Sequence, residues 1–124
     1  MSAFKPPGWP SLVPRLFAAD PVRLALFIKA AFGATGEVQT GRPTELSIDG
    51  SMLLVSDGAG VREATASVLY LYVPDCDATY AKALDAGATS VEPPDDTPYG
   101  DRRATVRDPA GNTWQIATRQ PASA

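Results

Sequence analysis

The chain repeats part of its own sequence about halfway along its length, and this repeat constrains the fold more than any other feature. The residues that recur at nearly the same offset are Gly33-Ala34-Thr35 with Gly87-Ala88-Thr89, Val13 with Val68, Phe17 with Tyr72, and Asp20 with Asp75. A repeat of this kind indicates that one supersecondary unit occurs twice. In each copy an apolar run leads into a helical pattern and then into further short apolar runs. We therefore predict two βαβββ modules in an α+β fold.

One helix is predicted in each copy. The first begins at Asp20-Pro21, because aspartate caps a helix and proline suits its first position. Apolar residues then recur three and four positions apart, and Gly33 provides the left-handed residue that ends a helix. In the second copy the helix begins on Asp75 or Asp77 and ends at Gly87.

Short strands surround each helix, because apolar and β-branched runs are bounded there by turn residues. The dipeptide Asp49-Gly50 suits the positive φ angles of a tight hairpin, and Asp108-Pro109-Ala110-Gly111 suits another turn. Prolines confine the run at residues 90–94 to a sheet edge. The predicted strands are residues 12–17, 35–40, 44–48 and 51–55 in the first copy, and 66–73, 90–94, 102–108 and 112–118 in the second.

A glycine-rich, charged stretch without periodicity separates the two copies and predicts a loop. We expect an N-terminal segment at residues 1–10, a first module at 11–58, a linker at 59–65, a second module at 66–118 and a tail at 119–124.

Composition excludes several classes of function. The 11 Lys and Arg residues are outnumbered by 14 Asp and Glu residues, so nucleic acid and anionic membranes are disfavoured as partners. No stretch has the apolar length of a signal peptide or membrane span, and we expect a cytoplasmic protein. Cys76 is the single cysteine, which rules out an intrachain disulfide. The chain has no histidine, so the commonest general base and metal ligand is absent.

Strand residues alternate between two faces, and the face turned away from the helices is expected to carry function. Its predicted members are Val13, Arg15, Phe17, Val68, Tyr70, Tyr72, Arg103, Thr105, Arg107, Thr113, Gln115 and Ala117. Such a mixture of aromatic and polar side chains favours a binding pocket. The alternative is an ordinary half-exposed sheet, in which Arg107 pairs with Asp108 or Asp101.

Other candidate residues have simpler interpretations. Trp114 is expected in the core, and Cys76 is expected to be structural because no histidine supports a nucleophile. Glu45 and Asp49 are expected to be solvated. Gly58-Ala59-Gly60 lacks the spacing of a phosphate-binding loop.

The order of elements, the helix DPVRLALFIKAAFGA, the loop DTPYGDR and the ending VRDPAGNTWQIAT resemble the vicinal oxygen chelate superfamily. This group contains glyoxalases, bleomycin-resistance proteins and extradiol dioxygenases, and the sequence is most similar to its PhnB-like branch. The resemblance extends from Ser11 to Thr118. It implies that the two modules form a curved mixed sheet around a concave cavity, and that the protein is a homodimer.

Enzymes of that superfamily hold a divalent metal with one His, Gln or Glu from each of four strands. The matching positions here are Val13, Leu54 or its neighbour, Val68 and Gln115. Gln115 alone can coordinate a metal, whereas catalytic sites usually have three or more protein ligands. The resemblance therefore implies an apolar cavity with no metal and no other cofactor.

The leading hypothesis is a metal-free protein that binds a small, neutral or anionic aromatic molecule, with no catalytic residue assigned. The residues predicted to line its cavity are Arg15, Phe17, Leu54, Val68, Tyr70, Tyr72, Tyr99, Arg103, Arg107 and Gln115. One alternative is an enzyme, either with a metal on atypical ligands such as Glu45 or with Arg and Tyr polarising a carbonyl. Another is a protein-interaction module that uses an open sheet face.

Overall fold

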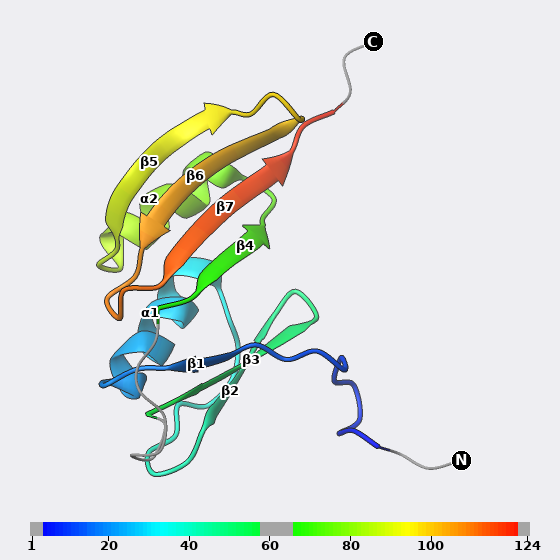
Figure 1. Ribbon diagram of the computed structural model, residues 1–124, viewed down its shortest axis with the longest axis vertical. Helices are drawn as coiled ribbons and strands as arrows, with labels where there is room; N and C mark the ends of the chain where they lie inside the picture. Colours follow the sequence, from blue (N-terminus) through cyan, green and yellow to red (C-terminus); the bar gives the residue numbers. More distant parts are fainter. Residues whose placement is uncertain (1–3, 58–65, 122–124) are drawn as a thin grey trace.

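The computed structural model describes residues 4–57 and 66–121, and within them the chain forms two helices and seven strands (Figure 1). The elements are β1 (Arg15–Phe17), α1 (Pro21–Phe32), β2 (Thr44–Ile48), β3 (Ser51–Ser56), β4 (Val68–Tyr72), α2 (Cys76–Asp85), β5 (Thr89–Asp96), β6 (Asp101–Arg107) and β7 (Thr113–Arg119). The α+β class is confirmed. The predicted linker at 59–65 and the Gly58-Ala59-Gly60 stretch lie outside the described residues.

The first sheet has the strand order β1-β3-β2, with β1 parallel and β2 antiparallel to β3. The hairpin between β2 and β3 turns at Asp49 and Gly50, whose φ angles are 44° and 82°, as predicted. The prediction of a strand at residues 35–40 is wrong, since that segment contributes an isolated bridge between Thr35 and Ser47. Gly36 interrupts the extended backbone with a φ of 135°.

Substitution of Gly36 tests this interpretation. A Cβ atom at residue 36 would lie 2.2 Å from the backbone oxygen of Glu45, which cannot move without disturbing β2. Gly36→Ala should therefore lower the free energy of unfolding by about 2–4 kcal/mol, measured by urea denaturation. Gly41→Ala is the matched control, because its φ is also positive but nothing lies within 4 Å of the added atom. That control should lose about 1–2 kcal/mol, and equal losses in the two variants would contradict the close contact.

The second sheet has the strand order β4-β7-β6-β5. Strand β4 is parallel to β7, while β6 is antiparallel to both β7 and β5. This is the complete βαβββ arrangement that the sequence predicts for the second copy. The proline-containing strand β5 lies at the sheet edge, and its register with β6 shifts on both sides of Glu92.

Both helices begin where the sequence signals predict, and α1 also ends as predicted, whereas α2 ends at Asp85, two residues before Gly87. The side chain of Asp20 accepts a hydrogen bond from the backbone N–H of Arg23, and Gly33 ends α1 in the left-handed conformation. Asp75 caps α2 by accepting from the backbone N–H of Ala78, which decides between the two predicted starts. Among the described residues no helix has both the length and the apolar character needed to cross a membrane.

The helices pack against each other, and α2 lies behind the four-stranded sheet in the view of Figure 1. Core residues come from one face of each strand, because side chains alternate along a strand. The largest fully buried apolar side chains are Trp114, Leu16, Leu24, Ile28, Leu46, Ile116, Val55 and Val106. Leu69, Leu71 and Val73 pack against this core, which leaves the opposite face of the second sheet uncovered.

Candidate functional site

The uncovered face of the second sheet carries most of the predicted site, and we call it the open face. Its members follow from strand alternation and from the register of β4, β7, β6 and β5. They are Val68, Tyr70 and Tyr72 of β4, Thr113, Gln115, Ala117 and Arg119 of β7, Asp101, Arg103, Thr105 and Arg107 of β6, and Glu92 of β5. The row across its middle consists of Tyr70, Gln115, Thr105 and Glu92.

The residues predicted from sequence fall into two groups on two sheets. The open face holds Val68, Tyr70, Tyr72, Arg103, Arg107 and Gln115, and the hydroxyl of Tyr99 accepts a hydrogen bond from the Arg103 guanidinium. The second group lies on the first sheet, where Arg15 and Leu54 are in register. The Arg15 guanidinium lies 5.2 Å from the ring centroid of Phe17. It also donates to the Ser56 hydroxyl at 3.3 Å.

A buried carboxylate organises the tyrosines of the open face. Asp101 is 1% exposed, and its Oδ2 accepts hydrogen bonds from the hydroxyls of Tyr70 at 2.6 Å and Tyr72 at 2.8 Å. The two rings are 5.3 Å apart between centroids. To reach Asp101 on β6, the tyrosines of β4 extend across β7, where the small residue Ala117 is fully buried. The rings therefore lie over β7.

Arg119 is the cation that lies against the Asp101 carboxylate. Its Nε lies 3.1 Å from Asp101 Oδ1, outside hydrogen-bond geometry, so the contact is an ion pair alone. The same guanidinium donates to the backbone oxygen of Tyr99 at 2.8 Å. Arg119 thus connects the last strand to the loop that precedes β6.

The protonation states of the cluster follow from these contacts. The hydrogen bond from Tyr70 lowers the pKa of Asp101, and the Tyr72 hydrogen bond with the charges of Arg119 and Arg103 acts in the same direction, against the effect of burial. Burial, followed by the hydrogen bond to Asp101, raises the pKa of Tyr70 above its ordinary value. At neutral pH both phenol hydrogens are bound to a charged carboxylate. The tyrosines therefore offer a ligand their ring faces and edges.

Sequence reasoning missed two carboxylates of this face. Asp101 belongs to the loop DTPYGDR in the sequence interpretation, although it alternates with Arg103 on strand β6, and this spacing indicates that the two residues share a face. Glu92 accepts a hydrogen bond from the buried Thr105 hydroxyl at 2.8 Å. Its side could not be predicted, because the register shifts around Glu92 break the alternation that strand patterns depend on.

Two polar side chains of the open face are left without a partner. Neither the Gln115 carboxamide nor the Arg107 guanidinium has a hydrogen bond or ion pair with any residue in the described ranges. The pairing of Arg107 with Asp108 or Asp101, which the sequence left open as the alternative, does not form. Asp108 instead accepts from Trp114 and its own turn, and Asp101 accepts from the tyrosines.

The positions that the resemblance matches to metal ligands offer little to a divalent ion. Val68 and Gln115 lie on the second sheet, whereas Leu54 lies on the first and Val13 precedes β1. Valine and leucine have no donor atom, so Gln115 would be the single protein ligand among these positions. No group of three or more Asp, Glu or Cys residues close enough to share a metal occurs within residues 4–57 and 66–121.

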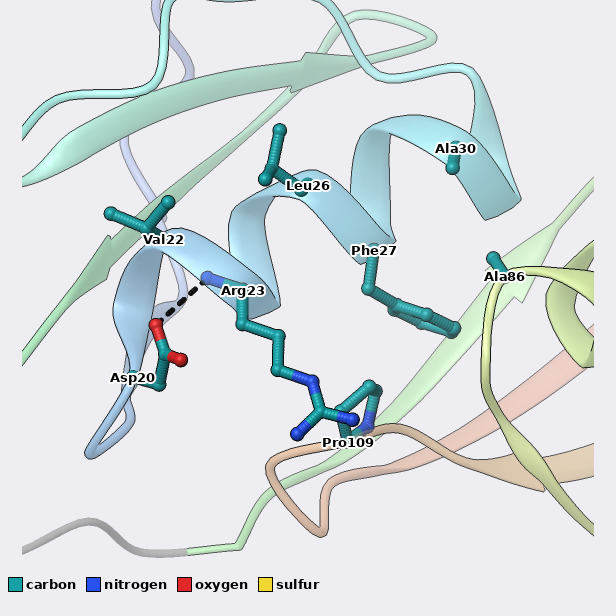
Figure 2. Close-up of a pocket in the computed structure, with 8 residues that line it drawn as sticks. All are labelled: Asp20, Val22, Arg23, Leu26, Phe27, Ala30, Ala86 and Pro109. Carbon is teal, nitrogen blue, oxygen red and sulfur yellow. Dashed lines mark hydrogen bonds between the residues drawn. The ribbon is translucent and has the colours of Figure 1, made fainter.

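Three surface hollows can be placed relative to the open face. A hollow of about 300 Å³ lies between β4 and the segment Pro10–Pro14, and Tyr70 is one of its lining residues. A polar hollow of about 260 Å³ involves Arg42 and Glu45. A groove of about 380 Å³ lies between α1 and the turns at Ala86 and Pro109 (Figure 2). Of these three, the first alone adjoins the open face.

Comparison with known proteins places the chain among others of similar fold. Residues 16–116 match the family described as Glyoxalase/Bleomycin resistance protein/Dioxygenase superfamily. An uncharacterized protein of Mycobacterium bovis is 32% identical in an alignment 127 positions long, which includes 86% of this chain and 82% of that relative. TioX from Micromonospora sp. ML1 is 26% identical, with a TM-score of 0.73 over 87% of this chain and 97% of that one. A third protein is a glyoxalase/bleomycin resistance protein/dioxygenase family enzyme from Burkholderia phytofirmans PsJN. It is 21% identical, with a TM-score of 0.74 over 86% of this chain and 96% of that one, so the similarity shows a shared fold alone.

Proposed function

The chain belongs to the glyoxalase/bleomycin resistance protein/dioxygenase superfamily, and from this premise we propose that it binds a small organic molecule on its open face without a metal ion. The observation that carries the proposal is the position of Gln115 and Arg107. Both offer hydrogen bonds that no described residue uses, and both lie on the same sheet face as the exposed ring of Tyr70. Apolar surface with a few convergent polar groups is typical of ligand sites.

The proposed ligand is aromatic and carries an anionic group. Tyr70 and Tyr72 present ring surface, since their hydroxyls are bound to Asp101. Arg107 would bind a carboxylate with its planar guanidinium, and Gln115 would donate or accept a further hydrogen bond. We place the chain in the PhnB-like branch as part of this proposal, on the loop and ending that the sequence shares with it.

We also propose that the protein is a cytoplasmic homodimer in which the open face is covered. Support comes from the exposed fractions of Val68, Tyr70 and Tyr72, which are 73%, 41% and 50% in the single chain. Exposed apolar side chains that lie together often mark a contact with another molecule. Arg15, Phe17 and Leu54, on the separate first sheet, would complete the cavity either from the same chain or from its partner.

Native mass spectrometry is the first test of the proposed function. The protein would be measured as isolated and after incubation with manganese, nickel and zinc. We expect the mass of a dimer that retains no metal ion after buffer exchange, because the superfamily's ligand positions supply one donor. A stoichiometric metal that survives buffer exchange would contradict the metal-free proposal.

Gln115→Ala should weaken binding of an aromatic carboxylate without unfolding the protein. With 3-phenylpropanoate as the probe, we expect the dissociation constant to rise about five- to tenfold, the worth of one hydrogen bond. Urea denaturation should give an unchanged midpoint, since Gln115 bonds to no described side chain. Gln39→Ala, the same exchange in the loop before β2, is the control and should bind the probe normally. Equal affinity in both variants would remove Gln115 from the site.

A further inference from the structure

The open face carries two opposite charges that do not pair with each other. Arg107 and Thr105 are two residues apart on β6, and Glu92 of β5 is in register with Thr105. Both charged residues are therefore neighbours of Thr105. Arg107 is about 7 Å away along the strand, and Glu92 is about 5 Å away on the adjacent strand. Neither forms an ion pair with a residue of the described ranges.

Two other arginines of this sheet do form ion pairs. Arg102 pairs with Asp77 and Asp96, and Arg119 pairs with Asp101. Opposite charges on adjacent strands normally stabilise a sheet by pairing. Glu92 and Arg107 remain apart, and both are exposed.

Thr105 keeps Glu92 on the open face. The buried hydroxyl donates to Glu92 Oε1 at 2.8 Å, and Oε2 has no hydrogen bond to any residue that the structure describes, so it can accept one from outside the chain. The tyrosine rings lie over β7, next to the strand that carries Thr105 and Arg107. An aromatic group, a cation and a carboxylate therefore surround one patch with Gln115 at its centre, and neither charge is in an ion pair within residues 4–57 and 66–121.

We propose that the ligand is an aromatic zwitterion, with a carboxylate bound by Arg107 and a protonated amine bound by Glu92. This inference rests on the proposed function, because it names the ligand class of the same face. The ring of the ligand packs on Tyr70 and Tyr72. The amine would donate a charge-assisted hydrogen bond to Glu92 Oε2, a stronger interaction than one between neutral groups. Glu92 thus selects zwitterions over simple aromatic acids.

Three probes that share a phenyl ring test the inference by calorimetry or by NMR titration. They are 3-phenylpropanoate, which has the anion alone, 2-phenylethylamine, which has the cation alone, and phenylalanine, which has both. We expect phenylalanine to bind about tenfold more tightly than either of the others. Equal affinities for phenylalanine and 3-phenylpropanoate would overturn the inference and leave the proposed function standing. Failure of all three to bind would contradict the proposed function itself, and the inference with it.

Glu92→Gln separates a role in ligand selection from a role in folding. We expect it to lower the affinity for phenylalanine to that for 3-phenylpropanoate, while the affinity for 3-phenylpropanoate stays unchanged. Asp95→Asn is the matched control, because it removes one negative charge from the same strand, and it should preserve the tenfold preference. An equal loss for all three probes in Glu92→Gln would mean that Glu92 acts through the fold, and would also overturn the inference.

Discussion

Asp108→Ala is expected to lower the free energy of unfolding by about 2–6 kcal/mol. The upper end of this range would unfold most molecules of a protein whose free energy of unfolding is about 5 kcal/mol. Asp108 is buried in the turn between β6 and β7. Its Oδ1 accepts the backbone N–H groups of Ala110 and Asn112, both at 2.9 Å. Its Oδ2 accepts the Asn112 side-chain amide at 3.0 Å and the Trp114 indole N–H at 2.8 Å.

The size of the loss follows from what the substitution leaves behind. Asn112 and Trp114 are each 1% exposed, so water cannot replace the missing carboxylate as their hydrogen-bond acceptor. Each buried donor without a partner costs about 1–3 kcal/mol, and there are two of them in side chains. Asn112 also accepts the backbone N–H of Ser67 at 2.9 Å, so the same network fixes the entry to β4.

Urea denaturation followed by tryptophan fluorescence would measure the effect. Asp85→Ala is the matched control, since it makes the same exchange at the exposed end of α2, and we expect a change below about 0.5 kcal/mol. A midpoint for Asp108→Ala close to that of the control would show that the turn does not depend on the carboxylate.

Those parts of the fold that depend on local signals were predictable from sequence. Asp20 and Gly33 bound α1 because capping is a property of single residues and their immediate neighbours. The faces of β6 and β7 follow from alternation, which correctly placed Trp114 in the core and Gln115 opposite to it. In the same way, the Asp49-Gly50 turn has a local cause.

Features that depend on tertiary context were not predictable. Residues 35–40 have a strand-like composition, but Gly36 adopts a backbone angle that ends the ladder after Thr35. The register shifts in β5 conceal the side on which Glu92 lies. Asp101 and Asp108 both look like surface turn residues in the sequence. Asp108 is buried by donors of its own turn and by the Trp114 indole, whereas Asp101 accepts hydrogen bonds from tyrosines of the distant strand β4. The alternation of Asp101 with Arg103 indicates its face of the sheet, but not these contacts.

Asp101→Asn is expected to destabilise the protein most at neutral pH, with a loss that shrinks as the solution becomes acidic. The pKa of Asp101 is lowered in the folded state from its ordinary value of 3.8, so the unfolded chain takes up the proton first as pH falls. The stability that the carboxylate contributes is fully present above pH 3.8 and is lost as pH falls through the lower, folded value. Below that range wild type and variant both carry a neutral group at residue 101.

The same substitution should also change the titration of Tyr70. The hydrogen bond to Asp101 and the charge of Asp101 both raise the pKa of Tyr70, so removal of the charge should let the phenol ionise at a lower pH than in the wild type. Absorbance of tyrosinate against pH would record the shift. Without the Asp101 carboxylate the rings of Tyr70 and Tyr72 should also be held less firmly. Binding of 3-phenylpropanoate should then weaken because the rings are misplaced, although Asp101 itself does not contact the probe.

Asp77→Asn provides the control for this experiment, because it separates a general effect of charge from the anchoring of the tyrosines. The hydrogen bond from Arg102 lowers the pKa of Asp77 too. The difference in free energy of unfolding between wild type and Asp77→Asn should therefore also become smaller as the solution becomes acidic. Its side chain is 54% exposed, against 1% for Asp101, and the loss at neutral pH should be smaller. Tyr70 should titrate as in the wild type. If Asp101→Asn also leaves the titration of Tyr70 unchanged, the hydrogen bonds from Tyr70 and Tyr72 to Asp101 do not fix the two rings on the open face.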